Sequence, residues 1–426
     1  MEFEQHLERY LSKDEIKKLV DALESAPKFG VLLNTEKMST NEFTSFFPNV
    51  KPHPIVKNAY IYDKLQYPLG KSYLHDTGCY YLQEPSAMLV STLLNPTKED
   101  IVLDMCAAPG GKTIQASLLM KNEGIIISND LSYVRAKALS SNVERMGRKN
   151  VVVTSMDMHH FPKKLHNTFT KIILDAPCSG SGMFRKDKNV ENDWTYEKVL
   201  KCASIQKELI EIAYSLLAPG GDIIYSTCSF SFEEDEEVIK QFLSNHADIS
   251  VIPFETNQFF YESEPKMGIH LFPSLFDGEG HYICLMHKDG NLNKKSFNLE
   301  NTKKNIQELL NHHNLNDNYG FVYNNTIYAL PIKFPLDNMT ILRPGLKIGT
   351  IENGNFIPDH ALSHYYSSQN SLPLNTKQFE KYIHGDIFEY QFKDGWNIVS
   401  YKGINLGYVK IVNNIAKNHY PKGLRR

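Results

Sequence analysis

Short apolar runs alternate with amphipathic stretches through the middle of the chain. The runs have the length of buried strands and lie at 101–105, 125–128, 151–155, 171–175 and 222–226. Apolar residues at helical spacing predict helices between or after them, at 111–121, 132–146, 204–217 and 233–245, and a last strand is expected within 281–287. Strands that alternate with helices predict a parallel sheet with helices on both faces, so we expect an α/β fold.

The first part of the chain has a different pattern. Apolar positions within 4–26 fit two short amphipathic helices. The segment 29–80 is rich in Pro, Tyr and Lys, and we interpret it as an extended arm with short strands. A further helix is expected to open at Pro85, because proline favours the first helical turn. Residues 1–95 are therefore expected to form a small α+β extension.

The pattern changes again after the α/β region, which we place at 96–289. A polar stretch rich in Asn and Lys at 290–305 is typical of a linker. Within 306–426, short apolar runs are separated by Asn-Gly, Asp-Gly and Lys-Gly turns, which predicts a β-rich region. All charged residues from Asn397 onward are basic and are interleaved with aromatic residues. This basic and aromatic composition is typical of either an RNA-binding face or a solvated basic tail.

Composition narrows the class of protein. The chain has 426 residues and a formal net charge of −3, which argues against a polycation but leaves local basic patches open. Its six cysteines show no Cys-x-x-Cys and no matching His spacing, so we expect neither disulfides nor a metal site. The N-terminus is charged, unlike a signal peptide, and no apolar run reaches the roughly 18 residues of a membrane span. We therefore expect a cytoplasmic monomer without membrane contact.

Three predicted strands are followed by polar turns that carry a thiol. Cys106 lies in Asp-Met-Cys-Ala-Ala-Pro-Gly-Gly-Lys-Thr, Cys178 in Asp-Ala-Pro-Cys-Ser-Gly-Ser-Gly, and Cys228 in Tyr-Ser-Thr-Cys-Ser-Phe. Because the carboxyl ends of parallel strands meet at one edge of a sheet, we expect the three thiols to converge there. A cytosolic cysteine is more often a small buried apolar residue, and this interpretation holds for Cys79, Cys202 and Cys284. The polar turns around Cys178 and Cys228 indicate chemistry instead.

A glycine-rich turn joins the first predicted strand to its helix. Such a turn at 107–111 lets a ligand approach the backbone closely. It lacks both the phosphate-loop and the dinucleotide glycine patterns, so nucleotide hydrolysis and NAD binding are disfavoured. Asp130 and Asp157 end the next two strands, where a carboxylate can accept hydrogen bonds from ribose hydroxyls. Together with Asp175, these acids at successive strand ends indicate a ligand site.

These motifs strongly resemble those of the RNA (cytosine-5) methyltransferase family, and the tail at 402–425 resembles its RsmF branch. The resemblance implies a Rossmann-like methyltransferase core that depends on S-adenosyl-L-methionine, RNA contact by residues 1–95, and a C-terminal RNA-binding region that ends in a PUA-like domain. It implies cofactor contacts by Cys106, Ala107, Ala108, Pro109, Gly110, Gly111, Lys112, Asp130, Asp157 and Asp175. The chain departs from the pattern at Asp130, where many members have Glu.

The resemblance also implies a mechanism. C5 of cytosine is a weak nucleophile, so a thiolate must first add at C6. Cys228 is the implied nucleophile, and Cys178 the group that assists proton removal and product release. Asp175 would contact the base, and Lys112 would orient these groups. The implied function is methylation of C5 of cytosine in RNA, with 16S ribosomal RNA or the small ribosomal subunit as the expected partner.

Three other functions were weighed against this one. An amino-group methyltransferase of the same fold would carry Asn/Asp-Pro-Pro-aromatic where this chain has Asp175-Ala-Pro-Cys178. An RNA-binding assembly factor without activity would have lost a thiol or the glycine turn, and this chain has both. Transfer RNA stays open as the rival substrate, because the catalytic motifs are shared across the family.

Overall fold

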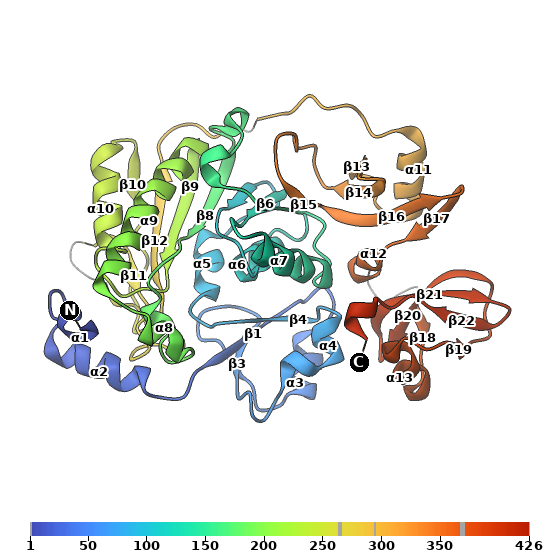
Figure 1. The fold of residues 1–426 in the computed structure, drawn as a ribbon, viewed down its shortest axis with the longest axis horizontal. Coiled ribbons are helices and arrows are strands. Elements are labelled where there is room, and N and C mark those ends of the chain that lie inside the picture. Colours follow the sequence, from blue (N-terminus) through green and yellow to red (C-terminus); the bar gives the residue numbers. More distant parts are fainter. Residues whose placement is uncertain (1, 263–265, 294, 367–370, 426) are drawn as a thin grey trace.

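A mixed sheet of nine strands lies at the centre of the computed structural model, which describes residues 2–262, 266–293, 295–366 and 371–425 (Figure 1). Its parallel strands are β5 (Ile101–Asp104), β6 (Ile125–Asn129), β7 (Val151–Thr154), β8 (Phe169–Asp175) and β9 (Leu217–Thr227). They lie in the order β7-β6-β5-β8-β9, and each neighbouring pair is parallel. The strands after β5 are added first on one side of it and then, from β8 onward, on the other side. Ligands bind outside the carboxyl ends of the strands at such a topological switch point.

Three antiparallel strands extend this sheet beyond β9. β12 (Tyr282–Lys288) pairs with β9, and β10 (Ile249–Val251) and β11 (Ile269–His270) both pair with β12. The antiparallel direction of β12 brings its first residues to the same edge as the carboxyl end of β9, with Tyr282 opposite Thr227. Residues just before β12 are thereby placed beside the strand ends.

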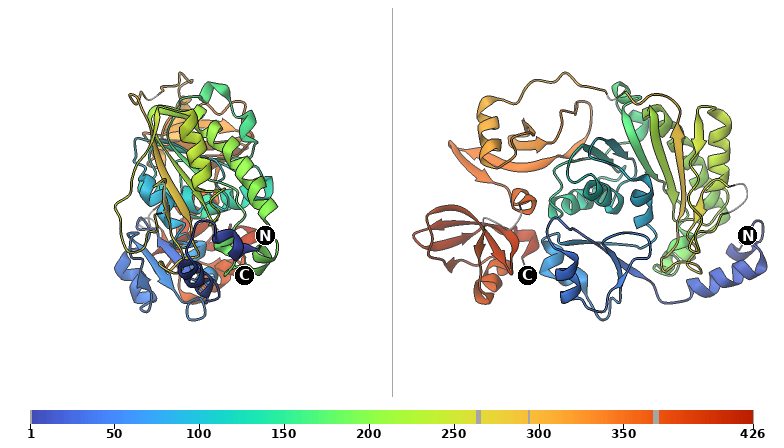
Figure 2. Two further views of the ribbon diagram at one scale, coloured as in Figure 1. Left: turned by 90° about the vertical axis from the view of Figure 1, so that its left-hand side faces the viewer. Right: turned by 180° about the vertical axis from the view of Figure 1, so that it is seen from behind.

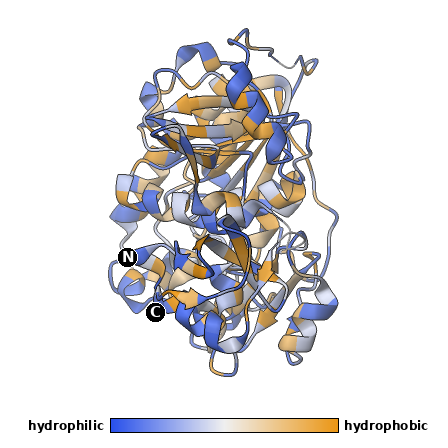
Figure 3. Ribbon diagram, turned by 90° about the vertical axis from the view of Figure 1, so that its right-hand side faces the viewer, coloured by the Kyte–Doolittle hydropathy of each residue, from blue (hydrophilic) through white to orange (hydrophobic). Residues whose placement is uncertain are grey.

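Helices cover both faces of the sheet. Alternate residues of β5 enter different apolar clusters, Ile101 and Leu103 on one face and Val102 on the other. The first face is covered by α9 (Tyr196–Leu216) and α10 (Glu236–Asn245), and the second by α5 (Met88–Leu94), α6 (Gly111–Leu119) and α7 (Tyr133–Arg145). Burial on both faces explains why these strands read as continuous apolar runs. Figure 3 shows hydrophobic stretches in strands of the interior and hydrophilic ones in many outer loops. The predicted α/β class is confirmed.

The N-terminal residues form two helices and a small sheet. The helices α1 (Phe3–Leu7) and α2 (Lys13–Leu23) pack on Phe184, Trp194 and Val199. A four-stranded antiparallel sheet follows, with β1 (Phe29–Leu33), β2 (Lys51–Pro52), β3 (Ala59–Tyr62) and β4 (Tyr80–Gln83), flanked by α3 (Thr40–Phe46) and α4 (Tyr73–Asp76). The sheet leads directly into α5, so this region reaches the edge of the main sheet.

The C-terminal region joins the main sheet and then builds two smaller ones. β15 (Ile341–Pro344) pairs antiparallel with β7, which makes it the outermost strand on that side. The first small sheet contains β13 (Tyr319–Tyr323), β14 (Thr326–Leu330), β16 (Leu346–Glu352) and β17 (Asn355–Pro358), with α11 (Lys304–His312) and α12 (His360–Tyr365) beside it. The second contains β18 (Leu372–Pro373), β19 (Phe388–Glu389), β20 (Gly395–Tyr401), β21 (Ile404–Val412) and β22 (Ile415–Asn418), with α13 (Thr376–His384).

The second small sheet returns to the N-terminal region. Tyr73 of α4 packs edge-on against Phe379 and Tyr401 of the C-terminal module. Figure 2 shows the two regions side by side from behind. None of the helices among the described residues has the length and apolar character that crossing a membrane requires. The predicted β-rich end of the chain is confirmed.

Several boundaries differ from the sequence-based expectation. α9 begins at Tyr196, well before the expected 204, because Thr195 accepts a hydrogen bond from the Lys198 amide and caps the helix. The helix expected to open at Pro85 begins at Met88. The turn Ala218-Pro-Gly-Gly lies inside β9 instead of ending the helix before it.

The candidate active site

A cavity of about 320 Å³ opens at the carboxyl ends of β5, β8 and β9. The strand ends contribute Asp175, Ala176 and Cys228 to its lining, and the N-terminal region contributes Tyr81 and Gln83. The glycine turn supplies Ala107, Ala108, Pro109, Gly111 and Lys112. Segments that are far apart in the sequence thus form one site, as the convergence of strand ends predicts.

Two glycines let the turn pack closely against neighbouring side chains, and Gly111 also lines the cavity. Gly110 has φ of +116°, a conformation that residues with a Cβ rarely adopt. A Cβ on Gly110 would lie 2.9 Å from Leu139, and one on Gly111 would lie 3.1 Å from Gln83. Gly111 begins α6, so backbone N–H groups of the helix start face the same cavity.

Lys112 and Asp175 form an ion pair within the cavity. The Lys112 Nζ lies 2.8 Å from Asp175 Oδ2, and the Ser226 hydroxyl donates to Asp175 Oδ1 at 2.7 Å. Burial alone would raise the pKa of Asp175, but the Lys112 ammonium holds that pKa below its ordinary value. Burial would likewise lower the pKa of Lys112, and Asp175 raises it instead. Both groups therefore stay charged at neutral pH.

The two predicted catalytic thiols are in contact. Cys178 Sγ lies 3.1 Å from Cys228 Sγ, and both residues follow neighbouring strands of the sheet. Cys228 lines the cavity. The hydrogen bond with Cys228 and burial together raise the pKa of the Cys178 thiol well above its ordinary value. Cys178 is therefore held as a thiol.

Glu234, which sequence reasoning missed, holds the two thiol-bearing turns together. It accepts hydrogen bonds from the Ser179 amide at 2.7 Å and from the Ser229 hydroxyl at 2.6 Å. Ser179 follows Cys178 and Ser229 follows Cys228, so one carboxylate fixes both turns. Gln206 of α9 donates to the same carboxylate at 3.1 Å. The only sequence signal was the run of acids at 233–237, which reads as an ordinary helix start.

Three predicted residues, besides Gly110 and Cys178, lie around the cavity without lining it. Cys106 packs against the core cluster beneath the sheet, so two of the three thiols meet and the third does not. The buried Asp130 carboxylate accepts from the amides of Ala108 and Ser132. Asp157 is half exposed, and its carboxylate caps a short helical turn through the His159 amide. The cofactor contacts of these three residues stay predictions.

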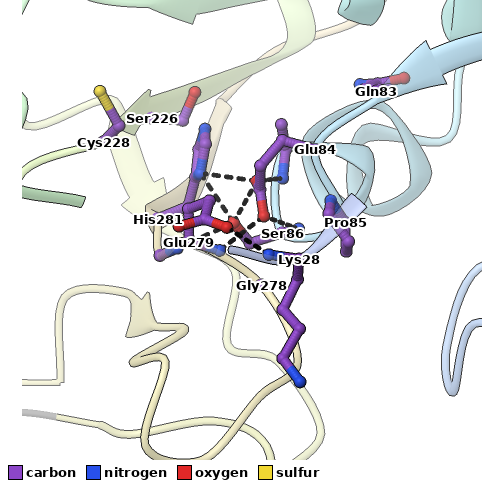
Figure 4. A network of polar contacts seen from close by, with 12 residues as sticks. Lys28, Gln83, Glu84, Pro85, Ser86, Ser226, Cys228, Gly278, Glu279 and His281 are labelled. Carbon is purple, nitrogen blue, oxygen red and sulfur yellow. Dashed lines mark hydrogen bonds and ion pairs between the residues drawn. The ribbon is translucent and has the colours of Figure 1, made fainter. Parts of the chain in front are cut away.

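A polar network beside the cavity was also missed. His281 lines the cavity, and its Nδ1 lies 3.0 Å from the Ser86 hydroxyl. The Ser86 hydroxyl donates to the buried Glu84 carboxylate (Figure 4). Ser86 and His281 are 195 residues apart, so no local sequence pattern joins them.

Models of three related domains match the chain in succession. Residues 1–85 match the N-terminal domain of 16S rRNA methyltransferase RsmF, 91–287 match 16S rRNA methyltransferase RsmB/F, and 369–426 match the RsmF PUA domain. The ribosomal RNA small subunit methyltransferase F of Vibrio vulnificus is 30% identical over 85% of this chain and 83% of its own length. This chain belongs to the small-subunit ribosomal RNA methyltransferase F family. The enzyme of that name from Shewanella loihica is 31% identical over 93% of this chain and 89% of its own length.

Solved structures agree with membership of the methyltransferase F family. A methyltransferase homologue from Pyrococcus horikoshii is 28% identical, with a TM-score of 0.58 over 66% of this chain and 93% of that one. NSun6 from the same organism has a TM-score of 0.60 at 20% identity and shows the same fold. The chain is an S-adenosylmethionine-dependent methyltransferase, and the glycine cradle beside a carboxylate-lined cavity fits that cofactor.

Proposed function

We propose that this protein methylates C5 of cytosine in 16S ribosomal RNA through a covalent adduct between Cys228 and C6. The contact between the thiols of Cys178 and Cys228, at 3.1 Å beside the Lys112–Asp175 ion pair, carries the proposal. An acceptor that one thiol activates must later be released from it, and a second thiol in the same site can assist that release. The names of the relatives support small-subunit ribosomal RNA as the substrate.

The chemistry follows from the positions of the two thiols. S-adenosylmethionine supplies the methyl group. The Cys228 thiolate forms a bond to C6, and the displaced electron pair of the ring makes C5 nucleophilic. Once Cys228 is bonded to C6, Cys178 gives up its thiol proton to water and, as a thiolate, accepts the C5 proton after methyl transfer to C5. The electrons of that C–H bond restore the C5–C6 double bond, and the electron pair of the C6–S bond returns to Cys228. The bond between C6 and Cys228 breaks in the same step, and Cys178 assists it from 3.1 Å away.

The Lys112–Asp175 ion pair lies beside both the attacking thiol and the expected position of the base. The Lys112 ammonium interacts electrostatically with Cys228 as well as with Asp175, so one cation lies near both the attacking sulfur and the base-contacting carboxylate. Asp175 faces the cavity and would contact the base, which develops charge during the addition. The turn from Cys106 to Lys112, with Asp130 and Asp157 at the next strand ends, would hold the cofactor.

RNA contact is assigned to the two ends of the chain. The match to the RsmF PUA domain and the basic residues from Asn397 onward support the C-terminal module as an RNA-binding surface. Ribosomal RNA as substrate would place the reaction in the cytoplasm. Bisulfite sequencing of total RNA from cells with and without the gene tests the substrate. Loss of a methylated cytosine in 16S RNA is expected, and loss in transfer RNA alone would contradict the assignment.

Trapping of the adduct tests the roles of the two thiols. Cys178→Ala is expected to accumulate a protein–RNA complex that survives denaturing electrophoresis, because the adduct forms but does not resolve. Cys228→Ala should form no complex and should lose turnover. Cys202→Ala, which changes a half-buried cysteine in α9, is the matched control and should behave as wild type. A complex in Cys228→Ala but not in Cys178→Ala would reverse the roles.

A further inference from the structure

His281 lies at the wall of the cavity, beside Asp175. It is 5% exposed and precedes β12 directly. Its Nε2 lies 4.0 Å from Asp175 Oδ1, and its Nδ1 points away from the cavity toward Ser86. The mechanism above leaves this imidazole without a role.

Hydrogen bonds behind the ring determine its tautomer. The Glu84 side chain accepts hydrogen bonds from the amides of Ser86, Ala87 and Glu279 and from the Ser86 hydroxyl, so it is a carboxylate and can only accept. The single hydroxyl hydrogen of Ser86 goes to Glu84. The Ser86 oxygen is left as an acceptor, and it also receives the Gly280 amide at 3.2 Å. The Nδ1 of His281 must therefore carry the hydrogen in its contact with Ser86.

The ring is neutral, so its other nitrogen is an acceptor. Burial is the largest influence on His281 and lowers its pKa, and the Lys112 ammonium acts in the same direction. A neutral imidazole has one N–H, and Nδ1 holds it. The lone pair of Nε2 therefore faces the cavity beside a carboxylate oxygen of Asp175.

The supporting segments fix this geometry. The Glu279 amide donates to Glu84 at 2.7 Å, and the Glu279 side chain accepts from Arg185 at 2.9 Å and from the Lys28 amide at 2.7 Å. Gly280 has φ of +118°, and a Cβ there would lie 2.4 Å from the ring of Phe230. The loop before His281 is thus tied to three other segments, and the imidazole has one orientation (Figure 4).

We propose that His281 selects cytosine, by accepting one hydrogen of the exocyclic amino group of the target base while Asp175 accepts the other. Two acceptors 4.0 Å apart on one wall match a group that has two N–H donors on one nitrogen. Uracil carries an oxygen in place of the amino group. That oxygen would face two other acceptors, Nε2 of His281 and the Asp175 carboxylate, and could form a hydrogen bond with neither. The inference rests on the proposed function, because it requires a base in this cavity.

The test uses a base that lacks only the amino group. RNA fragments around the mapped target would carry cytosine, 2-pyrimidinone or uracil at that single position. Their affinities would be measured by competition in the presence of S-adenosylhomocysteine, so that no transfer occurs. Wild type should prefer cytosine over 2-pyrimidinone, and His281→Phe should reduce that preference by about tenfold. His281→Gln keeps a hydrogen-bond acceptor near the position of Nε2, so it should retain most of the preference for cytosine.

Two further measurements separate the possible outcomes. Ser86→Ala frees Nδ1 and lets the hydrogen move to Nε2, so it should weaken the preference for cytosine without touching the ligand. Calorimetry with S-adenosylmethionine should give wild-type affinity for His281→Phe, which also shows that the variant is folded. An unchanged base preference in His281→Phe would overturn the inference, and weakened cofactor binding alone would assign His281 to the cofactor instead. A wild-type protein that methylates none of the fragments would remove the proposed function and the inference with it.

Discussion

Two partly buried lysines of this protein have opposite electrostatic properties. Lys112 in the active site lies 2.8 Å from a carboxylate, and its pKa is above the ordinary value. Lys37 lies where the N-terminal region meets α12 and the C-terminal module, and burial lowers its pKa to about 7. Its Nζ donates to the carbonyl groups of Thr77 at 2.7 Å and Arg145 at 3.4 Å. An anionic partner, not the degree of burial, decides whether a buried lysine keeps its charge.

The carboxylate nearest to Lys37 in sequence is already engaged. Glu36 pairs with Arg148, whose guanidinium lies 2.6 Å from it and is 1% exposed. Arg148 also lowers the pKa of Lys37 by repulsion. The partly buried His360 of α12 shows the same tendency, because burial lowers its pKa to about 4. At this junction of the N-terminal region, α12 and the C-terminal module, Lys37 and His360 therefore favour their neutral forms, although Glu36 and Arg148 are paired there. The active site keeps its lysine charged.

The largest effect is expected from breaking the active-site ion pair. Lys112→Met leaves the Asp175 carboxylate in the cavity without its cation, which should lower the free energy of unfolding by about 3 kcal/mol. Methyl transfer should fall by about 10²–10³-fold, because the site loses the cation that lies beside Asp175 and Cys228. Urea unfolding and a transfer assay measure the two effects. Lys37→Met is the matched control and should leave transfer near wild type; equal losses in both variants would contradict the comparison.

The active site could be predicted from the sequence further than the junction could. β5, β8 and β9 are buried on both faces and read as apolar runs, so the turns after them were bound to meet at one edge. The contact between Cys178 and Cys228 follows from that rule. The position of β15 in the main sheet could not be predicted from its short apolar run. It depends on tertiary contacts, namely pairing with β7 and hydrogen bonds from Arg343 to α7.

The same limit applies to the residues beside the cavity. Glu84, Ser86 and His281 act together only because the antiparallel β12 returns to the carboxyl end of β9. Asp157 shows the opposite case, since a strand-end acid with the expected spacing caps a turn through the His159 amide and remains half exposed. Spacing along the chain locates strand ends, and tertiary contacts decide which side chains at those ends face a ligand.

A smaller effect is expected from the ion pair at the junction. Arg148→Met removes the cation that engages Glu36, and it should lower the free energy of unfolding by about 1–2 kcal/mol, since Glu36 is partly exposed. The pKa of Lys37 should rise, because Glu36 becomes available to it and the repulsion by Arg148 is gone. Urea unfolding as a function of pH measures both. Lys149→Met, which breaks the neighbouring pair with the half-exposed Glu123, is the control and should have less effect on both quantities.

The smallest effect is a pH dependence that should belong to Lys37 and not to Lys112. The folded-state pKa of Lys37 is about 7, below the roughly 10.4 of a lysine in the unfolded chain. Between these values the unfolded chain binds a proton that the folded chain does not. Stability from this group therefore rises with pH, by at most about 1.4 kcal/mol per pH unit.

Substitution of each lysine isolates that slope. The difference in unfolding free energy between wild type and Lys37→Met should change by about 1 kcal/mol between about pH 7.5 and about pH 8.5. The corresponding difference for Lys112→Met should stay flat, because the raised pKa of Lys112 keeps it protonated in both states over this range. A flat difference for both lysines would mean that Lys37 keeps its charge at the junction, and that carbonyl groups alone can hold a buried ammonium there.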